Sequence, residues 1–150
     1  MEVVVRGANQ GDLPSIRSLL TSVNLTVAGV GEHLEHFLVV EDAGKIVGCA
    51  GLETYGFHAL LRSVAVHPHY RNRQLATSLV TRLVDQARKD RVHAVYLLTT
   101  TAELYFRRLG FATIPREDVD SSVRQSAEFS DSICATAPAM VLPLRAVAKH

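Results

Sequence analysis

The sequence predicts one α/β domain in which a central mixed sheet is flanked by helices. An apolar segment at 59–66, an amphipathic segment at 76–88 and a second apolar segment at 94–99 predict a strand, a helix and a strand. This order implies a right-handed crossover between two parallel strands. A hairpin over 36–52 adds antiparallel strands to the same sheet. A length of 150 residues suits one core, so we assign 1–150 to a single domain.

The first elements in chain order are a strand at 2–6 and a helix that begins after Asp12. Asp12 is a candidate N-cap, Pro14 lies in the first turn, and apolar residues then recur at helical spacing. Residues 22–36 contain two glycines, so we expect a loop with at most one helical turn there.

Three strands and the longest helix are predicted in the middle of the chain. Strands at 36–41 and 46–52 form the hairpin, joined by a turn at 42–45. The strand at 59–66 is almost continuously apolar, which favours a central place in the sheet. The helix at 76–88 has an apolar stripe on one face and charged residues on the other.

Shorter elements follow the crossover. After the strand at 94–99 we expect a short helix at 102–109, and Gly110 is a natural residue to end it. A further strand begins at 111–114.

The last part of the chain gives weaker signals. Residues 116–135 are polar, and a helix is predicted near 118–128. The segment 138–145 is predicted as a strand at a sheet edge, because Pro143 would interrupt a central strand.

Composition excludes several function classes. The net charge is +1, so no overall field attracts nucleic acid or an anionic membrane. No apolar run approaches the roughly 20 residues that span a bilayer, and the N-terminus lacks the pattern of a secretory signal. For Cys49 and Cys134, two reduced thiols in a cytoplasmic protein are preferred over one long-range disulfide. We therefore expect a cytoplasmic protein without nucleic-acid or membrane partners.

A basic turn, VHPHYRNRQLA at 66–76, joins the central strand to the long helix. The first N–H groups of a helix have no internal acceptor, and the helix dipole adds partial positive charge at that end. Arg71 and Arg73 add further positive charge. This arrangement predicts a binding site for a pyrophosphate.

The same turn resembles the acetyl-CoA motif of the GNAT N-acetyltransferases, Gln/Arg-x-x-Gly-x-Gly/Ala. The matching hexad is Arg71-Asn72-Arg73-Gln74-Leu75-Ala76, and Val64-Ala65-Val66-His67-Pro68 resembles the family's lead-in. Asp12-Leu13-Pro14 resembles the first helix of the family, and Leu109-Gly110-Phe111 resembles its Gly-Phe signature. The resemblance implies the GNAT fold and acetyl-CoA as cosubstrate.

The resemblance also implies which residues hold acetyl-CoA. Pantetheine would lie beside the strand at Val64, Ala65 and Val66, and the diphosphate would be held by Arg71, Asn72, Arg73, Gln74, Leu75, Ala76 and Thr77. Strands 60–66 and 94–99 would splay to admit the thioester. Gln74 stands where the family has Gly, and we expect it to aim its N–H at phosphate in an ordinary backbone conformation.

A narrower resemblance points to a substrate class. The runs Gly51-Leu52-Glu53 and Leu98-Thr99-Thr100 look like arsenic-resistance-associated (ArsN-type) acetyltransferases, as do Glu128-Phe129 and Cys134 in the tail. Residues 107–111 and the Leu-Thr-Thr run are also similar to N-acetylglutamate synthases. These relatives imply a small amino-acid-like amine as acceptor, either glutamate or an arsenical or phosphinic analogue, that attacks the thioester directly.

Three residues are candidates for proton transfer. Glu53, at the expected open end of its strand, is the first candidate for the general base, with a solvated strand-end residue as the alternative and His58 as a second candidate. Many GNAT enzymes have a Tyr four residues before the Gly of Gly-Phe, as acid to the thiolate. That position is Phe106 here and Tyr105 is one residue earlier, so Tyr105 is either the acid or part of the core.

Arg62, Thr99 and Thr100 are the candidate substrate-binding residues. Arg62 interrupts an apolar strand, so it either binds an acceptor carboxylate or pairs with Glu53 on the neighbouring strand. The threonines could hydrogen-bond near the thiolate. The histidines show no metal-ligand spacing, and we predict no metal.

Other functions stay open at this stage. The missing Gly at position 74 and the Phe at position 106 favour a non-catalytic acyl-CoA-binding or sensing module. A wide open cleft would favour a peptide or protein N-acetyltransferase. The family resemblance also implies pairing of two copies through edge strands, for which 138–145 is the candidate.

Overall fold

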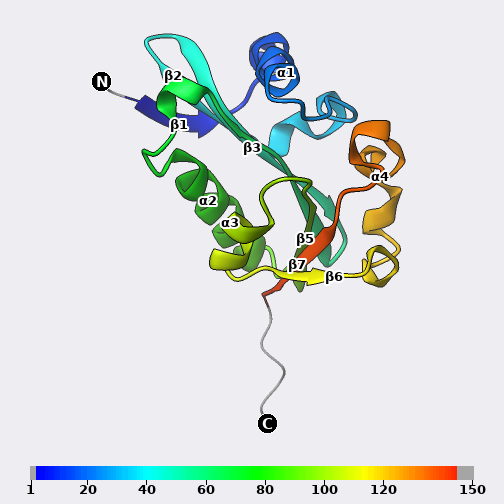
Figure 1. The fold of residues 1–150 in the computed structure, drawn as a ribbon. Coiled ribbons are helices and arrows are strands. Elements are labelled where there is room, and N and C mark those ends of the chain that lie inside the picture. Colours follow the sequence, from blue (N-terminus) through cyan, green and yellow to red (C-terminus); the bar gives the residue numbers. More distant parts are fainter. Residues whose placement is uncertain (1–2, 145–150) are drawn as a thin grey trace.

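A seven-stranded mixed sheet runs through the centre of the molecule (Figure 1). The structure is a computed structural model and describes residues 3–144. In chain order the strands are β1 (Val3–Gly7), β2 (Phe37–Asp42), β3 (Lys45–Tyr55), β4 (His58–Val66), β5 (Ala94–Leu98), β6 (Ala112–Ile114) and β7 (Ala139–Pro143). Their order across the sheet is β1-β2-β3-β4-β5-β7-β6. Because β4 and β5 are parallel and their neighbours antiparallel, the predicted mixed sheet and the central place of β4 are confirmed.

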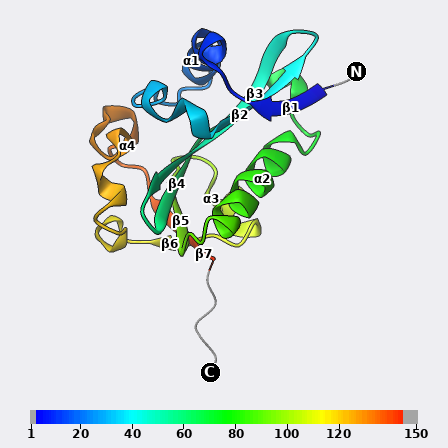
Figure 2. The same ribbon diagram turned by 180° about the vertical axis from the view of Figure 1, so that it is seen from behind.

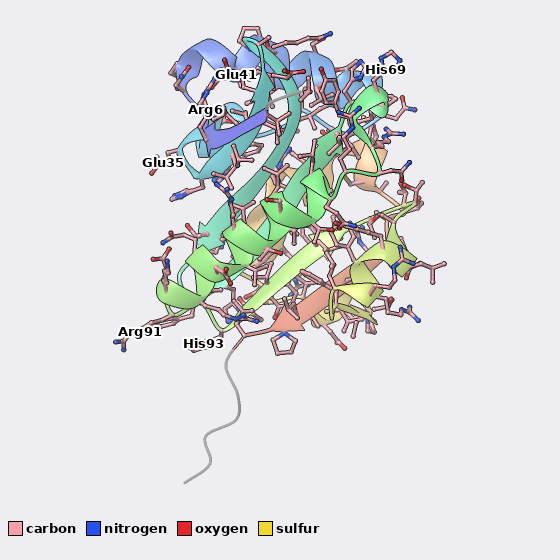
Figure 3. The ribbon with its side chains drawn as sticks, turned by 90° about the vertical axis from the view of Figure 1, so that its left-hand side faces the viewer. Arg6, Glu35, Glu41, His69, Arg91 and His93 are labelled. Atoms are coloured by element: carbon pink, nitrogen blue, oxygen red, sulfur yellow. The ribbon has the colours of Figure 1, made fainter. Side chains whose placement is uncertain are left out.

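Helices cover both faces of the sheet (Figures 1 and 2). They are α1 (Leu13–Ser22), α2 (Leu75–Lys89), α3 (Glu103–Arg108) and α4 (Ala127–Ser130). One face packs against α2 and α3, and the other packs against α1 and against the segment 116–135 that includes α4. In Figure 3, α2 lies along the sheet, with His69 before its start and Arg91 and His93 beyond its end. Among residues 3–144, no helix combines the length and apolar character needed to cross a membrane.

The N-terminal strand is tied to its neighbours by ion pairs of Arg6. Its Nε lies 2.8 Å from Glu41 Oε1 on β2, and its Nη1 lies 2.8 Å from Asp12 Oδ2. Asp12 is the N-cap residue of α1, as predicted, but its carboxylate bonds Arg6 and the Asn9 N–H instead of capping α1. Glu2, part of the predicted first strand, lies outside the described residues.

The segment 116–135 forms short turns, and the predicted helix at 118–128 is wrong. Its elements are 3-10 turns at Arg116–Asp118, Val123–Gln125 and Ser132–Cys134, together with the single turn of α4. Asp120 Oδ1 accepts the Ser122 N–H at 3.0 Å, and such local side-chain bonds compete with a continuous helix.

The last strand lies inside the sheet, so the prediction that 138–145 forms an edge is wrong. The shorter β6 adds outside β7, and a dimer through that edge is therefore not supported. Pro143 is tolerated because it ends β7: it faces Ala94 of β5 and lies beyond the last residue paired with β6, Val141. Residue 145 lies outside the described residues.

Gly51 in β3 packs directly against the Phe37 ring, so a substitution at Gly51 tests how tight this contact is. A Cβ at Gly51 would lie 2.2 Å from Phe37 Cε1, and the Phe37 ring is buried. Gly51→Ala should therefore lower the free energy of unfolding by about 2 kcal/mol, the usual cost of overpacking, as measured by urea denaturation. The control is Gly7→Ala, where an added Cβ meets nothing within 4 Å. Equal stability of the two variants would show that the contact with Phe37 is not as tight as described.

Candidate functional site

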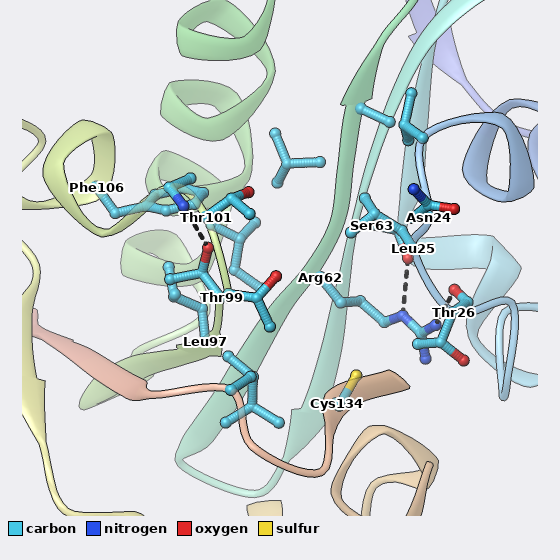
Figure 4. Close-up of a pocket in the computed structure, with 18 of the residues that line it drawn as sticks. Asn24, Leu25, Thr26, Arg62, Ser63, Leu97, Thr99, Thr101, Phe106 and Cys134 are labelled. Carbon is cyan, nitrogen blue, oxygen red and sulfur yellow. Dashed lines mark hydrogen bonds between the residues drawn. The ribbon is translucent and has the colours of Figure 1, made fainter. Parts of the chain in front are cut away.

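A cleft opens where β4 and β5 stop pairing. The two strands are joined at three positions, from His58 opposite Ala94 to Leu60 opposite Tyr96. Beyond these positions they separate, and a cavity of about 480 Å³ lies between them (Figure 4). The splayed strands predicted from the sequence are present.

A β-bulge in β4 lies at this opening. Cys49 faces Ala65 and Gly51 faces Arg62, so Ser63 and Val64 together oppose the single residue between them on β3. Ser63 has a left-handed φ of 59°. A bulge bends its strand and shifts the side-chain alternation by one residue. Val64 therefore faces the same core cluster as α2, and the backbone from Ser63 onward borders the cleft.

The start of α2 supplies backbone donors at the upper end of the cleft. Ser78 N–H donates to Gln74 O at 3.0 Å, while the three preceding amides, Leu75 to Thr77, have no acceptor within the helix. Ala76 lines the cleft, and its small side chain keeps the approach to these amides open. The helix dipole adds partial positive charge here, and this end of the cleft therefore has the features that favour an anion.

The basic turn before α2 differs from the prediction at Gln74. Gln74 has φ 62° and ψ 18°, the left-handed region in which the family Gly is favoured, so the expected ordinary conformation is wrong. Asn72 is also left-handed, with φ 64°. Arg71, which lines the cleft, donates from Nε to Val66 O at 3.2 Å, and the Arg73 guanidinium lies over the Tyr70 ring at 5.3 Å. These contacts hold the turn against the end of β4.

The opposite wall carries hydroxyl groups. Thr99, Thr100 and Tyr105 all line the cleft, as the sequence prediction requires. Thr99 Oγ1 accepts the Ala102 N–H at 3.0 Å and so begins the turn into α3 (Figure 4). The Tyr105 hydroxyl lies 2.8 Å from Thr77 Oγ1 in the first turn of α2. Tyr105 therefore presents its hydroxyl beside the free amides, whereas Phe106 packs in the core.

Glu53 is buried, and its predicted place at an open strand end is wrong. Strand β3 continues past it to Tyr55, and Glu53 is 0% exposed. Although burial favours the neutral acid, hydrogen bonds from the Tyr55 hydroxyl and from Arg62 outweigh burial and lower the pKa of Glu53. The second candidate base, His58, lies at the start of β4 with Nε2 3.3 Å from Asp120 Oδ2. Neither residue lines the cleft.

Arg62 pairs with Glu53, which is the structural alternative considered for it. Its Nη1 donates to Glu53 Oε2 at 2.7 Å. Its Nε donates to Ser63 Oγ at 2.9 Å (Figure 4). Its Nη2 reaches Thr26 O at 3.4 Å. Arg62 also borders the cleft, but its side chain is 0% exposed and three of its five N–H groups already make these bonds, which favours the pairing with Glu53.

Glu128 of α4 is a site residue that sequence reasoning missed. It lines the cleft, and its Oε2 lies 3.7 Å from Arg62 Nε. Burial raises the pKa of Glu128 to about 7 despite the nearby positive charge of Arg62. In the sequence, Glu128-Phe129 is only a part of the resemblance to the C-terminal segment of ArsN-type acetyltransferases. That resemblance does not indicate that the Glu128 carboxyl group is buried in the cleft.

Two chain segments close the cleft on the side of Glu128. Thr26 Oγ1 in the segment after α1 donates to Asp131 Oδ2 at 2.8 Å, and this bond joins two loops that are distant in sequence. Arg116 Nη1 donates to the carbonyl oxygens of Cys134 and Ala137 at 3.0 and 2.8 Å. Asn24, Leu25 and Thr26 line one side, and Cys134 lies below them (Figure 4).

Comparison with known proteins identifies the fold and the family motif. The model of the Acetyltransferase (GNAT) family matches residues 15–111. The fold is similar to N-acetylglutamate synthase from Neisseria gonorrhoeae, complexed with coenzyme A and N-acetyl-glutamate, with a TM-score of 0.82 and 22% identity over 97% of this chain and 36% of that chain. It is also similar to a Mycobacterium tuberculosis protein in complex with CoA, with a TM-score of 0.76 and 25% identity over 95% of this chain and 99% of that one.

The curated relatives share a common name. An amino-acid acetyltransferase from Aeromonas salmonicida is 32% identical over 57% of this chain and 20% of its own length. One from Photobacterium profundum is 30% identical over 71% of this chain and 26% of its own length. The chain thus spans about a fifth to a quarter of these two relatives.

Gln74 should be replaceable by glycine with a gain in stability. A left-handed residue other than Gly costs roughly 1–2 kcal/mol, and Gly avoids this strain at the cost of some unfolded-state entropy. Gln74→Gly should therefore raise the free energy of unfolding by up to about 1 kcal/mol in urea denaturation. The matched control is Gln86→Gly on the exposed face of α2, which should lower the free energy of unfolding by about 1 kcal/mol. A loss of stability at both positions would contradict the left-handed conformation of Gln74.

Proposed function

Because the chain belongs to the acetyltransferase (GNAT) family, we propose that it transfers an acetyl group from acetyl-CoA to the amine of a small amino-acid-like substrate. The observation that carries the proposal is the cleft between β4 and β5, at whose upper end the free amides of α2 lie. The amides of α2 would bind the anionic diphosphate of acetyl-CoA, and the cleft would hold the extended part that carries the thioester.

The residues present suit coenzyme A. Amides of Leu75, Ala76 and Thr77, together with Arg71, would hold the diphosphate, because unpaired helix N–H groups and a cation both favour phosphate oxygens. Ala76 leaves room for that approach. The bulged part of β4, from Val64 to Val66, would pair with pantetheine as an added strand. Acetyl-CoA supplies the activated acetyl group.

The chain's own groups would serve direct attack by the amine. The backbone N–H near Val64 or Ala65 is the proposed donor to the carbonyl oxygen as charge develops on it. Tyr105 is the proposed proton donor to the leaving thiolate, supported by the position of its hydroxyl in the cleft beside Thr77. For Glu53 we propose a positioning role through Arg62, because its carboxylate is buried and already paired.

The loops that close the cleft on the side of Glu128 limit the size of the acceptor. The Thr26–Asp131 bond and the Arg116 contacts place two loops over the region where an acceptor would bind, which favours a small molecule over a protein surface. Relatives named amino-acid acetyltransferase support an amino acid. Glutamate is the first candidate, and its phosphinic and arsenical analogues are the next. A cytoplasmic location is also proposed, consistent with the free thiols of Cys49 and Cys134.

A turnover screen tests this function. Thiol release from acetyl-CoA is measured with glutamate, other amino acids, phosphinic and arsenical analogues, polyamines and peptide N-termini. We expect turnover with at least one small amino-acid-like amine. Turnover with peptides alone would identify a peptide N-acetyltransferase. Binding of acetyl-CoA without turnover on any amine would identify a sensing module.

Loss of the anion site should abolish cofactor binding without unfolding the chain. In Arg71→Ala/Ala76→Glu, a cation is lost and a carboxylate stands before the amides that would meet the diphosphate. Affinity for acetyl-CoA, measured by calorimetry, should fall by at least about 100-fold, as removal of several charge-assisted hydrogen bonds predicts.

The control for this double variant is Arg82→Ala/Thr81→Glu, which changes the charge of the exposed face of α2 by the same amount. Its affinity should stay within about twofold of the unmodified chain, since exposed charges are largely screened. Equal losses in both double variants would mean that net charge, and not the proposed site, governs binding.

A further inference from the structure

The acceptor side of the cleft holds a buried carboxyl group that has no part in the function proposed above. Glu128 is 6% exposed, and its Oε1 has no hydrogen-bond partner within residues 3–144. Buried polar atoms are normally paired, because an unpaired one costs the lost hydration of that atom. Glu128 also lines the cleft, so a molecule bound there could supply the missing donor.

Neighbouring elements hold this carboxyl group in place. Ser126 Oγ accepts the Glu128 N–H at 3.2 Å and fixes the first turn of α4. On the β4 side, Arg62 Nε lies 3.7 Å from Glu128 Oε2 and leaves Oε1 available. Gly29 packs beside Arg62 and the start of α4, because a Cβ there would lie 3.3 Å from both Arg62 Nη1 and Ala127 Cβ. One oxygen of the carboxyl group therefore lies beside a cation, and the other is open to a donor.

The charges around Glu128 favour a cationic guest. Arg62 on β4 already balances Glu53 on β3, whose carboxylate also lies 3.6 Å from His33 Nε2. Asp131 and Cys134, from the segment after α4, add a negative charge and a thiol on the same side, and Asp131 raises the pKa of Glu128 further. With both carboxylates ionised, the Glu53–Arg62–Glu128 cluster has one excess negative charge. An ammonium group is the guest that this cluster would bind best.

We propose that Glu128 receives the amino group of the acceptor and is the general base of acetyl transfer. The inference deepens the proposed function and rests on it. Oε1 would accept an N–H of the acceptor ammonium, and Arg62 is a positioning residue that holds Oε2. The free oxygen, the burial and the place in the cleft carry this assignment, which replaces Glu53 in that role.

Protons and electrons balance in this step. The acceptor ammonium gives one proton to Glu128, and the amine lone pair then forms the N–C bond to the acetyl carbon. The C–S bond breaks and its electron pair stays on sulfur as the thiolate. The second N–H proton passes to solvent as the amide forms. Tyr105, the proposed donor, gives its proton to the thiolate and regains one from solvent, so that the whole reaction releases one proton. Glu128 returns its proton to solvent.

Glu128→Gln tests the assignment, since Gln keeps the shape and removes the base. With the best acceptor from the turnover screen, kcat should fall by about 100-fold, the usual contribution of a general base. The Kd for acetyl-CoA should stay unchanged. The matched control is Glu117→Gln, an exposed glutamate of the same segment, for which kcat and Kd should both stay at the wild-type values.

The pH dependence gives a readout that a purely structural role would not move. In the wild type, kcat/KM should rise with pH to a plateau above about pH 7, where Glu128 is ionised. In Glu128→Gln that plateau should be lost, and the rate should keep rising with pH until the acceptor ammonium has lost its proton in solution. The same profile in both proteins would overturn the proposal.

Stability identifies the titrating group independently of activity. The pKa of Glu128 is raised by folding, so the native state retains a proton that the unfolded state releases, and stability is lost as pH rises through the folded value of about 7. The Tm of Glu128→Gln minus the Tm of the wild type should therefore increase as the pH is raised from about 5 to 8. A constant difference across this range would overturn the assignment of the raised pKa to Glu128.

The two proposals fail in different ways. A wild-type chain that turns over no amine overturns both the proposed function and this inference. A wild-type chain that is active, together with a Glu128→Gln variant that keeps full kcat, overturns only the inference. If Glu128→Gln is poorly folded, Glu128→Ala with added formate decides the question: formate should restore turnover as an external base, and absence of rescue in the folded protein would contradict the proposal.

Discussion

The functional geometry depends on the separation of β4 from β5 after three paired positions. The bulge at Ser63 and Val64 lies at that point and changes the phase of β4, so that the two strands no longer present matching edges. One structural irregularity thus produces both the cavity and an unpaired strand edge. The start of α2 lies at the end of the same strand, because a short basic turn connects them. The strand edge and the helix N-terminus therefore border the same cleft from two directions.

The second constraint is electrostatic. Arg62 and Glu53 have side chains that are both 0% exposed, and such a pair is stable only when its remaining hydrogen bonds are satisfied. Ser63 and Thr26 supply those bonds, so the bulge, the loop after α1 and the ion pair are one connected structure. Glu128 contacts this group of residues through Arg62, which lies near one of its carboxyl oxygens. The other oxygen has no hydrogen-bond partner within residues 3–144. The pair can therefore act as a scaffold, while the outer carboxyl group is available for chemistry.

Much of the fold could be predicted from local patterns. The apolar stripe from Leu75 onward and the continuous apolar run of β4 indicated the strand, helix and strand order, and Gly110 marked the end of α3. The left-handed conformation of Gln74 was missed because its residue type disfavours it, although the Gly that the family has at this position was the available signal. The burial of Glu53 depends on partners from Tyr55 and Arg62, and it could not be deduced from its place after an apolar run. The inner position of β7 is decided by the pairing of β6, which is only three residues long.

A crystal structure with bound coenzyme A tests the central claim most directly. We expect diphosphate oxygens to accept hydrogen bonds from the amides of Leu75 to Thr77, and pantetheine to lie along the unpaired edge of β4 from Val64 to Val66. A nucleotide bound elsewhere, or pantetheine outside the opening between β4 and β5, would contradict it.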